Sequence, residues 1–291
     1  MTDSLPIPLT ALSTAQKTAL INLVRRTAKA EIMPRFRNLS HADISAKSSP
    51  YDLVTEADLA AEAMLARGIQ GMFPHALVIG EEASSADPDL RGKISEAELA
   101  FILDPLDGTW NFAHGLPLFG VILAATRFGK PVFGLLYDPV MDDWISADLD
   151  NTAHLSRNMG AARPLSVSRG GDIASLSGYV HLYLMPDEVQ AQMAAKLPDF
   201  ARTLMLRCSC HEYRTLAQGG MDFALSSVPN PWDHAAGLLI CQQAGGVARM
   251  LDGRDYTAGI TEGHILAAPD EDTWHRLRDH FAFLLDEAPK P

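Results

Sequence analysis

The sequence lacks the features that mark secreted and membrane-bound proteins. Its 291 residues include only three cysteines, with no Cys-x-x-Cys spacing, and a small odd number of cysteines suits a reducing compartment. The N-terminus has no basic start followed by an apolar stretch, so we expect no signal peptide. No run of 18 apolar residues is present, so we expect no membrane span. These absences predict a cytoplasmic protein.

Positive charge is also scarce. The chain carries 24 Lys and Arg residues against 36 Asp and Glu residues, which gives a formal net charge of −12. A surface of this sign argues against nucleic acid or an anionic membrane as the main partner. It is compatible with a small phosphorylated substrate, because a bound divalent cation reverses the local sign of the field.

Several catalytic motifs are missing as well: there is no Gly-x-Ser-x-Gly, no P-loop and no Gly-x-Gly-x-x-Gly. The histidines and cysteines have no zinc-site spacing. What the chain has instead is acidic residues where predicted elements begin or end, namely Asp58, Glu81, Asp104 with Asp107, and Asp233. Such a set of oxygen ligands favours a hard cation over zinc.

Hydrophobic periodicity predicts a mixture of helices and strands. We expect helices at 14–32, 55–68, 187–196, 213–217, 233–244 and 271–285. We expect strands at 76–79, 100–103, 118–128, 131–137, 144–147, 154–156, 178–184, 223–225 and 264–268, with 37–51 and 83–98 irregular. Without regular βαβ alternation, this pattern predicts an α+β layered fold. We interpret residues 1–291 as a single domain with halves of about 1–160 and 161–291.

The stretch 103–112, LDPLDGTWNF, allows two interpretations. Pro105 with a following glycine is typical of a β-turn. Alternatively, Asp104, Asp107 and the carbonyl of Leu106 offer three oxygens to Mg²⁺ on one bend. Two carboxylates so close repel each other, and a cation removes that cost. Taken alone, the stretch leaves both interpretations open.

The other acidic residues also have plain local interpretations. Asp58 with Thr55 forms a capping-box pattern at a helix start. Glu81 is typical of an exposed turn, and Asp233 of a helix N-cap. The stretch 87–98 places oxygen-bearing side chains at EF-hand positions, but a cationic Arg91 stands at one of them. We therefore interpret 87–98 as a solvated loop rather than a calcium site.

Together, four segments resemble the inositol monophosphatase superfamily of metal-dependent, lithium-sensitive phosphatases. They are DLVTEAD at 52–58, GEE at 80–82, DPLDGTWNF at 104–112 and WDHAAG at 232–237. The segments occur in the order found in that family and span most of the chain. The resemblance implies a five-layered α-β-α-β-α sandwich, a homodimer and hydrolysis of a small phosphate monoester by metal-activated water.

The resemblance also implies roles for individual residues. It implies two or three Mg²⁺ ions, with Mn²⁺ as a substitute, held by Glu81, Asp104, the Leu106 carbonyl, Asp107 and Asp233. It implies that Asp58, Thr109 and Glu81 act in catalysis. The amides of Gly108 and Thr109 would bind the phosphate, with Ser209, Ser226 and Asp233 as further substrate contacts.

The residues that would contact the substrate depart from the family pattern. Ser226 stands where inositol-specific members carry an acidic residue, which argues against inositol 1-phosphate. The stretch 207–213 is somewhat closer to the histidinol-phosphate phosphatase branch, and Trp110 replaces a basic residue common in bisphosphate nucleotidases. We rank a broad or sugar-type monoester first, histidinol phosphate second and a 3′(2′),5′-bisphosphate nucleotide third. The non-enzyme alternative is a regulatory binding protein that retains the fold.

Overall fold

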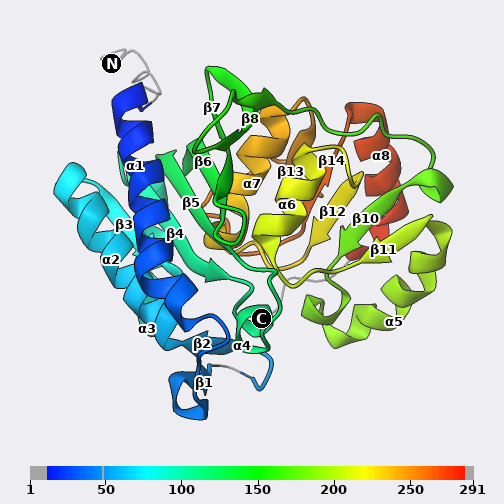
Figure 1. The fold of residues 1–291 in the computed structure, drawn as a ribbon. Coiled ribbons are helices and arrows are strands. Elements are labelled where there is room, and N and C mark those ends of the chain that lie inside the picture. The colour runs from blue at the N-terminus through cyan, green and yellow to red at the C-terminus, as the bar shows by residue number, and fades with distance from the viewer. Residues whose placement is uncertain (1–11, 48, 286–291) are drawn as a thin grey trace, which may run out of the picture.

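The computed structural model describes residues 12–47 and 49–285, and within them the chain forms an α+β layered sandwich (Figure 1). The helices are α1 Thr14–Thr27, α2 Glu56–Met72, α3 Glu81–Ala86, α4 Thr109–Ala113, α5 Asp187–Lys196, α6 Ser209–Ala217, α7 Pro231–Gln243 and α8 Glu271–His280. Short 3₁₀ or π turns follow or connect several of them. No helix in this part of the chain is long and apolar enough to cross a membrane.

Two large sheets carry the architecture. In the described residues, the seven-stranded sheet has the order β3 Leu77–Gly80, β4 Ala100–Asp107, β5 Gly120–Arg127, β6 Lys130–Asp138, β7 Asp143–Asp148, β8 Asn151–Arg157, β9 Arg163–Pro164. Its strands are antiparallel except for the β3–β4 pair. The five-stranded sheet has the order β11 Arg202–Leu204, β10 Ser177–Val180, β12 Phe223–Ser226, β14 Ile265–Ala268, β13 Val247–Met250. A small hairpin pairs β1 Ile44–Ala46 with β2 Leu53–Thr55.

The five layers follow from how the strands bury both faces. Alternate residues of a strand point to opposite faces, so in β4 Phe101 and Leu103 pack under α1 and α2, whereas Ile102 packs on the other side. There α6 and α7 lie between the two sheets, and α5 and α8 cover the far face of the five-stranded sheet (Figure 1). The predicted α-β-α-β-α sandwich is confirmed.

Helix α7 forms the middle of the sandwich and comes very close to the seven-stranded sheet. Gly134 of β6 faces it, and a Cβ atom there would lie only 2.7 Å from the carbonyl oxygen of Ala236. A side chain at this position would therefore hold the helix away from the sheet. This close approach sets the position of the first turn of α7, which carries Asp233.

The structure corrects several local expectations. The stretch 37–51 contains the short strand β1, and 83–98 is largely helical, with α3 followed by a 3₁₀ segment at Pro88–Ser95. Strand β4 continues past Leu103 to Asp107, so the stretch with the two aspartates is not a β-turn. Its pairing with β5 shifts register between Asp104 and Asp107, and this irregularity accommodates Pro105.

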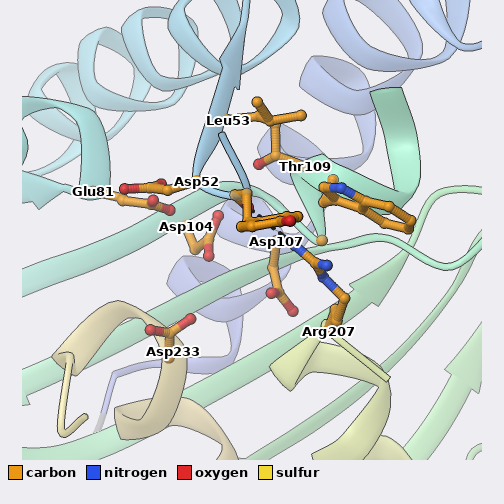
Figure 2. Close-up of a pocket in the computed structure, with 11 residues that line it drawn as sticks. Asp52, Leu53, Glu81, Asp104, Asp107, Thr109, Arg207 and Asp233 are labelled. Atoms are coloured by element: carbon orange, nitrogen blue, oxygen red, sulfur yellow. Dashed lines mark hydrogen bonds between the residues drawn. The ribbon is translucent and has the colours of Figure 1, made fainter. Parts of the chain in front are cut away.

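The start of α7 is also corrected. The N-cap is Asn230, Pro231 stands in the first turn, and Asp233 is the third helical residue rather than the cap. Proline is favoured at the first helical position because its missing N–H has no intrahelical partner there. Asp233 therefore does not cap the helix, and its carboxylate points toward the end of β4 (Figure 2).

Candidate active site

A pocket opens where β4 ends and α4 begins. It has a volume of about 150 Å³. Its described lining comprises Tyr51, Asp52, Leu53, Glu81, Asp104, Asp107, Gly108, Thr109, Trp110, Arg207 and Asp233 (Figure 2). These residues come from both halves of the chain, because the first turn of α7 and the approach to α6 meet the end of β4 here.

Three carboxylates converge in this pocket. One oxygen from each of Asp104, Asp107 and Asp233 lies within 4.8 Å of the others. Asp104 and Asp107 are buried and Asp233 is partly buried. Loss of water raises the pKa of all three, and the repulsion of neighbouring carboxylates adds to it; the pKa of Asp107 reaches about 6. No Lys or Arg in the described residues pairs with them.

The surrounding backbone holds these carboxylates in place. Asp104 accepts a hydrogen bond from the amide of Leu106 at 3.1 Å. Asp107 accepts from the amide of Cys210 and from the thiol of Cys208, at the start of α6. Helix α6 therefore fixes the end of β4, and the acidic cluster stays together although its charges repel.

Glu81 lines the same pocket but has a cationic partner. The ammonium of Lys47 lies 2.7 Å from one oxygen of Glu81 and 2.7 Å from one of Glu82. Burial alone would lower the pKa of Lys47, but these two carboxylates more than offset that and raise it. The Lys47–Glu81 pair was not foreseen from the sequence, because the two residues are far apart in the chain and follow no periodicity.

Asp58 and Thr109 form a hydrogen-bonded pair beside the carboxylates. The Thr109 hydroxyl lies 2.9 Å from Asp58 Oδ1 and 3.0 Å from the Leu106 carbonyl oxygen. Asp58 Oδ2 accepts from the amide and hydroxyl of Thr55, so the capping box predicted at the start of α2 is present. Burial raises the pKa of Asp58 to about 6, and the hydrogen bonds from Thr55 oppose that rise.

The turn between β4 and α4 depends on glycine. Gly108 has φ of +87°, which side-chain-bearing residues rarely adopt, and a Cβ there would lie 2.8 Å from the Leu118 carbonyl oxygen. Gly108, Thr109 and Trp110 line the pocket, and the first amides of α4 have no intrahelical partner.

Most of the residues expected at the site come together, with two exceptions. Ser209 is buried at the start of α6, and Ser226 is buried with its hydroxyl 3.4 Å from the Val228 amide. Neither is among the described lining residues. Conversely, Tyr51 and Arg207 line the pocket without having been assigned a role from the sequence, since each stands in an irregular segment.

The chain is similar to several proteins of known family and structure. The model of the inositol monophosphatase family matches residues 14–283. The chain is 26% identical over 217 residues to a Thermotoga maritima protein named fructose-1,6-bisphosphatase/inositol-1-monophosphatase, covering 74% of this chain and 78% of that protein. It is 28% identical over 256 residues to the Nus factor SuhB of Vibrio cholerae, covering 86% and 91%. The crystal structure of inositol monophosphatase-II from Staphylococcus aureus has the same fold, with a TM-score of 0.75, 22% identity and coverage of 94% and 97%.

Proposed function

The chain belongs to the inositol monophosphatase family, and from that premise we propose that it is a Mg²⁺-dependent phosphomonoesterase. The substrate class is a small inositol, sugar or polyol phosphate. The observation that carries the proposal is the cluster of Asp104, Asp107 and Asp233, whose oxygens lie within 4.8 Å of one another in the pocket that Thr109 also lines.

The donor set fits a hard divalent cation. Three acidic side chains with raised pKa values, close together and without a described cationic partner, are costly unless a cation joins them. When bound, such ions supply Lewis acidity, which acidifies water and neutralises charge on the phosphoryl group. Asp104, Asp107 and Asp233, with the Leu106 carbonyl and Glu81, would hold two or three Mg²⁺ or Mn²⁺ ions. A cation at Glu81 would compete with the ammonium of Lys47.

Asp58 and Thr109 would handle the proton of the attacking water. The proton leaving the water passes to Thr109 Oγ1 while the hydroxyl hydrogen moves to Asp58 Oδ1, across a distance of 2.9 Å. With a pKa of about 6, Asp58 is mostly ionised near pH 7 and can accept that hydrogen. The amides of Gly108 and Thr109 would meanwhile orient the phosphate.

The test is phosphate release from a panel of monoesters with and without Mg²⁺. We expect activity that requires the metal, and we expect Asp104→Asn to abolish it. Thr109→Val should lower kcat by about 10²–10⁴-fold, because it removes the hydroxyl that contacts Asp58. Thr109→Ser, which keeps the hydroxyl, is the matched control and should retain most of the activity. A protein inert on every monoester with Mg²⁺ or Mn²⁺ would overturn the proposal in favour of a regulatory binding protein.

Metal binding itself can be measured without turnover. We expect Mg²⁺ or Mn²⁺ to raise Tm, since a ligand that binds only the folded state stabilises it. Asp104→Asn and Asp233→Asn should shrink that shift. We also propose that the chain acts as a cytoplasmic homodimer and is inhibited by millimolar Li⁺, which light scattering and inhibition assays would check.

A further inference from the structure

One cationic side chain stands at the edge of the acidic pocket. Among the described residues that line it, Arg207 alone carries a positive charge (Figure 2). In that view it reaches toward the pocket from the side opposite Glu81. The proposed metal chemistry assigns it no role, and no carboxylate in the described part of the chain forms an ion pair with it.

Aromatic and backbone groups hold the Arg207 guanidinium in position. It lies 4.2 Å from the centre of the Trp110 ring, which is a cation–π contact. Trp110 is in turn stacked on His114, with ring centres 4.0 Å apart. Arg207 Nη2 donates a hydrogen bond to the Tyr51 carbonyl oxygen at 3.0 Å. These contacts use the ring face and one donor, whereas an arginine offers five N–H donors in a plane.

The backbone of Arg207 is also unusual. Its φ is +56°, in the left-handed region that disfavours side-chain-bearing residues. Strain of this kind persists where the surroundings hold it, and it is concentrated at binding sites. Glycine would fit this backbone better, so an arginine at this position carries a local conformational cost.

We propose that Arg207 binds a second anionic group of the substrate, so that the preferred substrate is a phosphate monoester that also carries another phosphate or a carboxylate. A guanidinium with unused coplanar donors matches the two oxygens of such a group. The ester phosphate lies at the carboxylate cluster, and the second anion lies against Arg207 at the Trp110 and Tyr51 side of the pocket. The cavity of about 150 Å³ suits a small molecule.

This inference rests on the proposed phosphomonoesterase activity and refines its substrate class. It ranks histidinol phosphate low, because that ester carries an ammonium group that Arg207 would repel. It also explains how a site with so many carboxylates can bind a doubly anionic compound at its outer edge.

The test compares matched pairs of esters that differ only in the second anion. For a second phosphate the pair is fructose 1,6-bisphosphate and fructose 1-phosphate. For a carboxylate the pair is 3-phosphoglycerate and glycerol 3-phosphate. The measured quantity is the ratio of kcat/KM within each pair, and the pair with the larger ratio identifies the second anion.

Arg207→Gly is the informative variant, because glycine adopts the φ of +56° without strain and the fold should persist. We expect it to lower the ratio for one pair about 10- to 100-fold, the range for a lost charge-assisted hydrogen bond. Arg207→Lys should give an intermediate ratio, since it keeps the charge but not the planar fork. Arg202→Gln, at an exposed position of β11, removes the same charge outside the pocket and should leave the ratio unchanged.

The outcomes separate the two proposals. If Arg207→Gly lowers kcat/KM equally for both members of each pair, Arg207 binds the reacting phosphate and the inference is wrong, although the phosphatase proposal stands. Calorimetry gives the corresponding ratio of dissociation constants within each pair. This binding ratio can be measured even if the chain shows no turnover. Equal ratios in wild type and Arg207→Gly by both methods would overturn the inference.

Discussion

The close approach of α7 to the seven-stranded sheet gives a sharp prediction for Gly134→Ala. The new Cβ would lie 2.7 Å from the Ala236 carbonyl oxygen and 3.0 Å from its Cα. Both are backbone atoms, so no side chain can turn aside. Ordinary contact begins near 3.4 Å, and α7 must therefore move by about 0.7 Å.

Two effects should follow. Overpacking of this kind costs about 1–3 kcal/mol of unfolding free energy, which in a chain of this size lowers Tm by about 2–6 °C. Asp233 lies one turn before Ala236, so the shift also displaces its carboxylate from Asp104 and Asp107. A misplacement approaching 1 Å can cost up to about 10²-fold in rate, and we expect kcat to fall at least about tenfold.

The assay is urea unfolding together with phosphate release, and the matched control is Gly71→Ala. Gly71 lies in the last turn of α2, where an added Cβ meets nothing within 4 Å. Alanine there should raise stability by up to about 1 kcal/mol and leave kcat unchanged. The reasoning is refuted if Gly134→Ala is as stable and as active as wild type, or if the two substitutions shift stability in the same direction.

Three further predictions concern residues that do not line the pocket. Arg214→Leu should lower the free energy of unfolding in urea by about 3–5 kcal/mol, because it leaves buried Asp143 and the Leu136 carbonyl without the Arg214 guanidinium. Arg157 is an exposed partner of the same aspartate, and Arg157→Leu should cost under about 1 kcal/mol. Equal costs for the two substitutions would contradict this account. None of the three thiols should react with a thiol reagent at pH 8 until denaturant is added, because all are buried and burial raises the pKa of Cys241 to about 12; rapid labelling of native protein would show otherwise. Asp142→Asn should destabilise by up to about 1 kcal/mol at pH 7, because hydrogen bonds from Arg25 and then Lys29 hold the pKa of Asp142 well below its usual range. A group whose pKa is lowered in the folded state stabilises the protein above its unfolded pKa of about 4, and this stabilisation is lost as the pH falls. The difference in unfolding free energy between wild type and Asp142→Asn should therefore disappear in acid. A difference that persists at low pH would exclude this ion pair as its cause.

Local signals in the sequence predicted much of the framework. The capping box of Thr55 and Asp58 marked the start of α2, and two apolar runs on either side of Gly129-Lys130 marked the hairpin of β5 and β6. These features depend on neighbours within a few residues, which the sequence displays directly. The order of the four acidic segments carried the family resemblance, and through it the fold.

Other features depended on contacts between distant segments. Strand β4 extends to Asp107 because β5 pairs with it across an irregularity, a condition that the Pro-Leu-Asp-Gly pattern does not reveal. The pairs Lys47–Glu81 and Arg207–Trp110 join residues 34 and 97 positions apart. The wrongly predicted start of α7 has another cause, because the local signal was present in the sequence. Asn230-Pro231 has the pattern of an N-cap followed by a first-turn proline.

The division of the acidic cluster between β4 and α7 has a consequence for the order in which the molecule matures. During synthesis, Asp104 and Asp107 leave the ribosome more than a hundred residues ahead of Asp233. The third carboxylate joins the other two only once α7 lies between the sheets. Assembly of the site is therefore a late event, which requires α7 to be synthesised and packed between the sheets.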